Sequence, residues 1–206
     1  MTVSCRRSGS EAAPAVDGGW AAGVSAIEIE DNFVPRRFDV PNPGLISKEE
    51  QVGKLEAAVA ARTDPTTVIV ARTASLGLCP LDEALDRIKA YSETGAEALM
   101  LTGTRSRDQI EAVHRTTSLP LCVLSPPADV RNDASFLAAN GVRILMLGNP
   151  IFAVAVKAIY DGLKHLKDGG PLEDLSGLQA APELLASVNR TEEFRQLQRE
   201  YLRGGE

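Results

Sequence analysis

The sequence predicts an α/β protein in which a parallel β-sheet is covered by helices. Five short apolar segments alternate with longer segments of helical periodicity, and the connections between them are short. The apolar segments are nearly continuous, as in strands that are buried on both faces. The expected strands are residues 25–30, 67–71, 98–101, 119–124 and 142–147.

Capping residues mark the helices between these strands. Ser47 and Glu50 have the spacing of a capping box, and Ser106 and Gln109 have it too. Pro80 is typical of a first helical position. Further helices are expected over 81–94, up to the Asn140-Gly141 pair, from Pro150 to about 169–170, and over 192–202 after Thr191.

The composition is that of a globular protein with a substantial core. The chain has 206 residues, of which 44% are hydrophobic and 24% charged, and its net charge is -6. This charge argues against nucleic acid as a partner, because phosphate binding needs a basic face. No run of 18 apolar residues exists, so no membrane span is expected. Three scattered cysteines, Cys5, Cys79 and Cys122, fit a reducing compartment, and we expect a cytoplasmic protein.

The first twenty residues differ from the rest of the chain. They are rich in Ser, Ala and Gly and lack a periodic apolar pattern. We expect a disordered leader over 1–20, followed by one folded domain over 21–206 that ends in helices.

Carboxylates gather at the end of the first predicted strand. Glu28 and Glu30 share one face by the period of two, and Asp31 follows where the chain must turn. Hard divalent cations prefer carboxylate oxygens, and magnesium usually takes only one or two of them. Glu30 and Asp31 are therefore candidate metal ligands. Glu30 could instead be a salt-bridged strand end, and Asp31 a loop or cap residue.

Glu28 lies on the same face as Glu30. If both side chains were buried, the two carboxylates would repel each other and the pKa of one of them would rise. Glu28 could instead face solvent or pair with an arginine.

Arg72 follows the second predicted strand at its carboxyl end. A planar guanidinium suits bidentate binding of a carboxylate, which makes Arg72 a candidate substrate-binding residue. It could also form an ion pair with Glu30 on the neighbouring strand, and both roles can hold at once.

Several segments resemble the isocitrate lyase and phosphoenolpyruvate mutase superfamily. They are Ile29-Glu30-Asp31, Ser47-Lys48-Glu49-Glu50, Asp64-Pro65 with 68–73, and Tyr91 to Gly95-Ala96-Glu97. The resemblance covers roughly residues 20–203. Within the superfamily, Leu101-Thr102-Gly103 and residues 152–161 are most similar to the oxaloacetate decarboxylase branch.

This resemblance implies a TIM-type (β/α)8 barrel. Such a barrel has eight βα units in about 250 residues, and the five predicted strands match the family's fourth to eighth. We therefore expect an incomplete barrel of about five parallel strands with flanking helices, in which the three N-terminal βα units are absent. In the family, acids on the third and fourth strands hold magnesium mostly through water. The resemblance thus implies Mg²⁺, or Mn²⁺, at Glu30 and Asp31, with affinity lowered by the missing acids.

The same resemblance assigns further residues. Residues 33–46 correspond to the family's gating loop, with Arg36 as a catalytic and Arg37 as a substrate-binding residue, and Arg72 grips a substrate carboxylate and takes part in catalysis. Phe38 stands where isocitrate lyases have the cysteine of KKCGH or KRCGH, which argues against their reaction. Asn149 stands where the decarboxylase branch tends to have histidine. It could bind substrate and serve catalysis, or it could be the N-cap of the following helix.

The expected function is a magnesium-dependent carbon–carbon lyase that decarboxylates oxaloacetate or cleaves a related 2-oxo or 2-hydroxy diacid. One alternative is phosphorus–carbon bond chemistry, as in phosphoenolpyruvate mutase or phosphonopyruvate hydrolase. Another is a truncated, inactive member of the family. The partner implied is a small-molecule carboxylic acid, and the family resemblance implies a homo-oligomer, a tetramer.

Overall fold

The computed structural model describes residues 23–34 and 44–202. Contacts divide the chain into two units, Met1–Gly148 and Asn149–Glu206. The expected leader over 1–20 and part of the loop over 33–46 lie outside the described residues. Each unit is described by itself.

The first unit is built on a parallel sheet with the strands in sequential order, β1-β2-β3-β4-β5. This confirms the predicted α/β class with five parallel strands, and each strand lies within two residues of its expected bounds. Adjacent strands are in register along the row Glu30, Arg72, Met100, Cys122 and Ile144. The strands are Ala26–Glu30 (β1), Val68–Thr73 (β2), Ala98–Leu101 (β3), Leu121–Leu124 (β4) and Val142–Met146 (β5).

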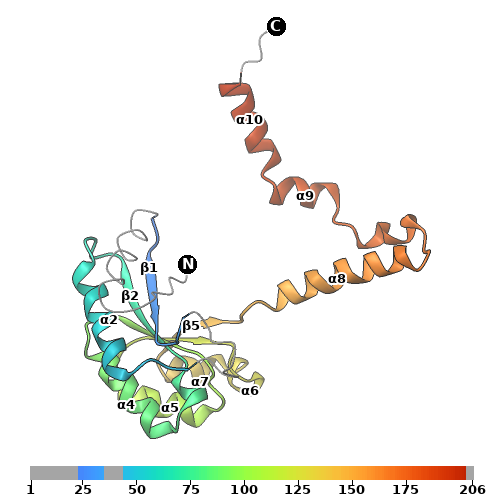
Figure 1. The fold of residues 1–206 in the computed structure, drawn as a ribbon. Helices are drawn as coiled ribbons and strands as arrows, with labels where there is room; N and C mark the ends of the chain where they lie inside the picture. The colour runs from blue at the N-terminus through green and yellow to red at the C-terminus, as the bar shows by residue number, and fades with distance from the viewer. Residues whose placement is uncertain (1–22, 35–43, 203–206) are drawn as a thin grey trace. The chain divides into compact units, whose positions relative to one another are not determined.

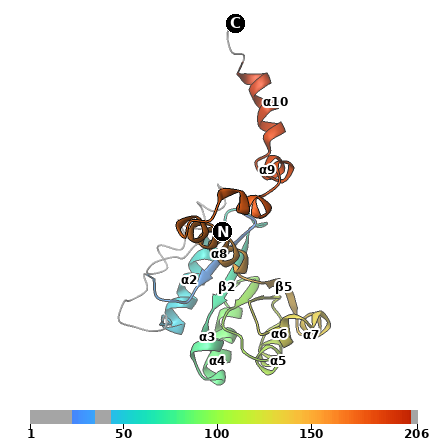
Figure 2. The same cartoon turned by 90° about the vertical axis from the view of Figure 1, so that its right-hand side faces the viewer.

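Helices cover one face of this sheet (Figures 1 and 2). The side chains of Ile27, Ile69, Leu99 and Val123 point into that layer and are completely buried. The opposite face carries Glu28 and Glu30 of β1 and their neighbours in the register. We call this opposite face the site face. It becomes more exposed toward β5, where Ile144 is 57% exposed.

Two helices begin where their capping boxes place them. The N-cap of α2 is Ser47, whose Oγ accepts a hydrogen bond from Glu50 N at 3.0 Å, and the N-cap of α5 is Ser106, which accepts from Gln109 N at 3.4 Å. Pro80 is the N-cap of α4 and not its first helical residue, because its ψ of 151° is extended. The helices of this unit are Lys48–Ala61 (α2), Ser75–Leu78 (α3), Leu81–Ser92 (α4), Arg107–Thr116 (α5), Ala128–Arg131 (α6) and Ala134–Ala139 (α7).

The second unit is helical. It consists of Pro150–Lys167 (α8), the 3-10 helix Leu172–Leu178 (η1), Pro182–Val188 (α9) and Thr191–Tyr201 (α10). Thr191 is the first residue of α10 and not the residue before it, because Arg190 takes the N-cap position with φ 51°. None of the described residues of this unit is buried. Within 23–34 and 44–202, no helix is long and apolar enough to cross a membrane.

Candidate active site at the ends of β1 and β2

Arg72 lies between two carboxylates of the neighbouring strand. Its Nη1 donates a hydrogen bond to Glu28 Oε2 at 3.2 Å, and its Nε lies 3.2 Å from Glu30 Oε1. The Nε contact is an ion pair without a hydrogen bond. The three side chains are 13–18% exposed. The predicted ion pair of Arg72 with Glu30 and the arginine-paired alternative for Glu28 are therefore both confirmed.

Two further side chains position Glu30. Asn32 donates from Nδ2 to Glu30 Oε1 at 2.6 Å, while Lys54 of α2 donates from Nζ to the backbone carbonyl of Glu30 at 2.7 Å. Lys54 is only 2% exposed. A buried cation thus lies beneath the end of β1, and the Glu30 carboxylate is held by side chains on its own and neighbouring segments.

Burial raises the pKa of the Glu30 carboxyl above its ordinary value. The positive charge of Arg72 opposes this shift, whereas the negative charges of Asp31 and Glu28 add to it. The expected repulsion between the acids of β1 is thus present, and Arg72 compensates it in part.

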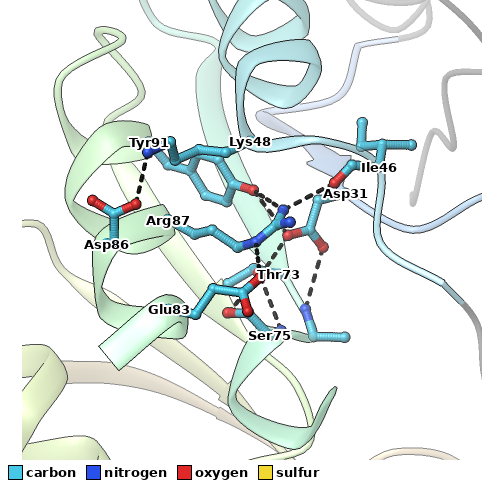
Figure 3. A network of polar contacts seen from close by, with 10 residues as sticks. Asp31, Ile46, Lys48, Thr73, Ser75, Glu83, Asp86, Arg87 and Tyr91 are labelled. Atoms are coloured by element: carbon cyan, nitrogen blue, oxygen red, sulfur yellow. Dashed lines mark hydrogen bonds and ion pairs between the residues drawn. The ribbon is translucent and has the colours of Figure 1, made fainter. Parts of the chain in front are cut away.

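Asp31 points to the opposite face from Glu30, into a buried polar network (Figure 3). Its carboxylate accepts hydrogen bonds from Thr73 Oγ1 at 2.6 Å, from Tyr91 Oη at 3.1 Å and from Ala74 N at 3.3 Å. Asp31 is completely buried, and burial raises its pKa although these hydrogen bonds lower it. The structure therefore does not bring Asp31 together with Glu30, and a metal role for Asp31 stays a prediction.

The network also fixes the segment that leads into α2. Arg87 of α4 donates from Nη1 to the backbone carbonyl of Ile46 at 2.9 Å and to Tyr91 Oη at 3.2 Å (Figure 3). Ile46 N donates to the Asp31 carbonyl at 2.9 Å. An antiparallel bridge between Asn32 and Leu45 lies beside it. The end of β1 and the start of α2 are thus tied together, while Arg36, Arg37 and Phe38 lie outside the described residues.

Asn149 is the first residue of the second unit and the N-cap of α8. The capping alternative is correct for the position of Asn149, but the side chain makes no capping hydrogen bond. Its catalytic and substrate-binding roles stay predictions.

The oxygen atoms around Glu30 fit a hard divalent cation. Within the described part of the chain, no three His, Cys, Asp or Glu residues cluster as a metal site. Magnesium needs fewer protein ligands than that, because waters complete its coordination. Next to the Glu30 carboxylate, the buried Oδ1 of Asn32 accepts no hydrogen bond. A carboxylate and an amide oxygen suit Mg²⁺ or Mn²⁺.

Sequence reasoning missed some residues of this site and left another open. Asn32 could have been found, because the period of two that joins Glu28 to Glu30 extends to it. Lys54 and Arg87 carry no such signal, because their partners lie in segments far away in the sequence. The environment of Glu28 was left open between burial beside Glu30, exposure to solvent and pairing with an arginine.

The fold and the site define an α/β protein whose polar residues gather at the carboxyl ends of parallel strands, the usual location of active sites in barrel enzymes. The sequence matches the family described as phosphoenolpyruvate phosphomutase over residues 6–167. The chain therefore belongs to this family, and its predicted place in the isocitrate lyase and phosphoenolpyruvate mutase superfamily is confirmed.

Relatives with assigned activities point to one branch. An oxaloacetate decarboxylase of Rhodopseudomonas palustris (strain HaA2) is 42% identical over 170 residues, which are 82% of this chain and 58% of the relative. An oxaloacetate decarboxylase of Bradyrhizobium sp. (strain BTAi1) is 39% identical over 185 residues, 90% of this chain and 64% of the relative. This chain thus spans about three fifths of the length of these relatives.

Solved structures show the same fold. A phosphoenolpyruvate phosphomutase of Streptomyces platensis subsp. rosaceus aligns with a TM-score of 0.81 at 25% identity, covering 98% of this chain and 73% of that one. A phosphonopyruvate hydrolase in complex with oxalate and Mg²⁺ aligns with a TM-score of 0.80 at 28% identity, covering 98% and 72%.

Proposed function

We propose that the protein is a magnesium-dependent carbon–carbon lyase that decarboxylates oxaloacetate or cleaves a related 2-oxo or 2-hydroxy diacid. The observation that carries this proposal is the placement of Arg72 beside Glu30 at the ends of adjacent strands. The similarity to oxaloacetate decarboxylases at about 40% identity supports the substrate class.

Arg72 would bind a carboxylate of the substrate. Its guanidinium is planar and permanently charged, and it lies on the site face with 18% of its side chain exposed. Lys54 and Asn32 would keep Glu30 in place next to it. Decarboxylation breaks the bond between C3 and the departing carboxylate, which leaves as CO2, and the electron pair passes into the enolate of pyruvate. The enolate then takes up a proton from solvent to give pyruvate. Breaking the carbon–carbon bond needs no strong base. Neither His114 nor His165, the two histidines of the sequence, is among the residues named for the site.

Glu30, with the neighbouring amide oxygen of Asn32, would hold the cation. When bound, a divalent cation supplies positive charge that stabilises the enolate oxygen. The magnesium named in the related hydrolase structure supports this choice of metal. Asp31 is the less favoured ligand, since three donors already use its carboxylate.

The test is pyruvate formation from oxaloacetate by the purified chain, with Mg²⁺ and with EDTA. We expect turnover above the free-metal background, and Arg72→Ala should lower kcat/KM about 100-fold or more because a charged hydrogen-bonding partner is lost. The matched control is Arg62→Ala. Arg62 also pairs with a glutamate, Glu97, at 2.6 Å. Arg62 lies at the amino end of β2, the opposite end from Arg72, so Arg62→Ala should retain turnover.

Equal rates in protein samples and protein-free controls at matched Mg²⁺ would contradict the proposal. That result would favour the alternative of an inactive member of the family. Equal loss in the Arg62 and Arg72 variants would show a general effect on folding instead of a role for Arg72 in the site.

Phosphorus–carbon bond chemistry is the second candidate. It is supported by the phosphonopyruvate hydrolase and phosphoenolpyruvate phosphomutase structures that share this fold. Incubation with phosphonopyruvate separates the two proposals: release of inorganic phosphate without decarboxylation of oxaloacetate would select the second.

We also propose that the chain assembles into a homo-oligomer, specifically a tetramer. We further propose that the protein is located in the cytoplasm. In the second unit, α8 carries large apolar side chains that are exposed, including Ile151 at 75% and Phe152 at 71%. The free thiols of Cys79 and Cys122 suit a reducing compartment. Light scattering after size-exclusion chromatography gives the mass, and a monomer would contradict the assembly.

A further inference from the structure

Glu28 is the resident hydrogen-bond partner of the arginine that the proposed function assigns to the substrate. Of the two carboxylates beside Arg72, Glu28 makes both the hydrogen bond and the ion pair, through Nη1 at 3.2 Å. Glu30 makes an ion pair only, at Nε. Glu30 is instead hydrogen bonded to Asn32. The guanidinium edge that would receive a carboxylate is thus shared with Glu28.

The register explains why Glu28 can reach this position. Glu30 is directly opposite Arg72 in the parallel pair, and Glu28 is opposite Val70. Both acids of β1 share the site face, so the guanidinium, which extends back along the strand, meets the earlier acid. Both ends of this contact are largely shielded from water, with 18% and 15% of the side chains exposed. Shielding strengthens the pair relative to one in solvent.

The three side chains by themselves, without a cation at Glu30, carry more negative than positive charge. Two carboxylates and one guanidinium sum to a net charge of -1 when all are ionised. A carboxylic acid ligand that binds Arg72 would have to take the place of an internal carboxylate or share the guanidinium with it.

We propose that Glu28 is a specificity-determining residue that competes with the ligand's carboxylate for Arg72, so that ligands bind by exchange with an internal anion. This inference rests on the proposed role of Arg72. Its consequence is that Glu28 lowers the affinity for every anionic ligand that uses Arg72, and a ligand needs a second anchoring group to displace Glu28. The site would thereby select dicarboxylates over monocarboxylates.

Calorimetric titration of the full chain with oxalate, at one fixed Mg²⁺ concentration, tests this exchange without turnover. Glu28→Gln should lower the Kd of oxalate about 10-fold, because the neutral amide competes less well for the guanidinium. Affinity for the monocarboxylate acetate should rise by a larger factor than affinity for oxalate. The double variant Glu28→Gln with Arg72→Ala should lose the gain, since the effect acts through Arg72.

The matched control is Glu97→Gln, which neutralises another arginine-paired glutamate away from the site face. It should leave the Kd unchanged. Unchanged or weaker oxalate binding by a folded Glu28→Gln chain would overturn the proposal, as would a gain that persists without Arg72 or appears equally in the control.

A second variant covers the case in which Glu28→Gln does not fold. Glu28→Asp keeps the charge but withdraws the carboxylate by one methylene group, and a tightening of about threefold is expected because the contact with Nη1 lengthens. No tightening would overturn the proposal.

The binding test also separates the exchange from the proposed reaction. If oxaloacetate is not decarboxylated but these affinities change as described, only the proposed reaction fails. If neither the wild type nor any variant binds oxalate, the exchange itself is overturned.

Discussion

Glu30 and Asp31 are neighbours in the sequence, yet their side chains lie on opposite faces of the sheet. Glu30 meets Arg72 on the site face, whereas Asp31 accepts a hydrogen bond from Tyr91 of α4 on the helix-covered face. The alternation of a strand thus continues one residue beyond β1. It gives two adjacent acids different tasks, one in the candidate site and one in the packing of the strand ends.

Asp31→Ala should destabilise the fold by about 2–4 kcal/mol, because buried hydroxyl donors of Tyr91 and Thr73 lose their acceptor. Urea unfolding followed by circular dichroism measures this change. Asp86→Ala is the control, since Asp86 is exposed and pairs with Lys48 at the surface. Similar losses in both variants would show that the buried network has no special importance.

Tyr91→Phe should cost about 1–2 kcal/mol of unfolding free energy, since it removes one hydroxyl that donates to Asp31 and accepts from Arg87. Tyr160→Phe removes a hydroxyl from a tyrosine that is 64% exposed and should change stability far less. Thermal unfolding of the two variants under identical conditions makes the comparison. A larger loss in Tyr160→Phe would contradict the assigned role of the network.

The thiol of Cys122 reports on the charge of Glu28. Burial raises the pKa of Cys122, the negative charge of Glu28 raises it further, and Arg72 lowers it. Glu28→Gln should therefore lower this pKa and speed alkylation by iodoacetamide at pH 8, because only the thiolate reacts. The measurement uses chains in which Cys5 and Cys79 are replaced by serine. Slower alkylation than in the parent chain would show that Glu28 does not act on this thiol.

Asp133 should give the first unit a stability that depends on pH. Its carboxylate accepts from Phe136 N at 2.9 Å as the N-cap of α7 and pairs with Arg107 at 2.9 Å, and these contacts lower its pKa below the ordinary 3.8. The unfolded chain binds the proton more readily than the folded chain. The contribution of Asp133 to the free energy of unfolding is therefore complete above its ordinary pKa and is lost as the pH falls through its lowered pKa.

Asp133→Asn isolates this contribution, because asparagine also caps helices but carries no charge. The variant should be less stable than the wild type near neutral pH, and the difference should shrink in acid. Urea midpoints at several pH values provide the comparison. A difference that grows as the pH falls would reverse the assigned sign.

The five strands, their parallel class and most helix starts could be predicted from the sequence. Those features depend on signals within a few residues, such as the alternation over β1 or the capping hydrogen bond of Ser47. The similarity to the family was also readable, because Glu30 and Arg72 stand in recognisable segments. Small errors remained at Pro80 and Thr191, where backbone angles at one residue decide the start of a helix.

The partner that each charged side chain takes could not be predicted from the sequence, because it depends on how the chain packs. Asp31 meets Tyr91 from 60 residues away, and Glu28 meets Arg72 from 44. Such pairs form where β2 pairs with β1 and where Tyr91 of α4 reaches the residue after β1. The choice of partner depends on register, burial and the loss of water around each charge. Two adjacent acids look alike in the sequence. The packing on either face of the sheet makes one a candidate ligand and the other a buried structural acceptor.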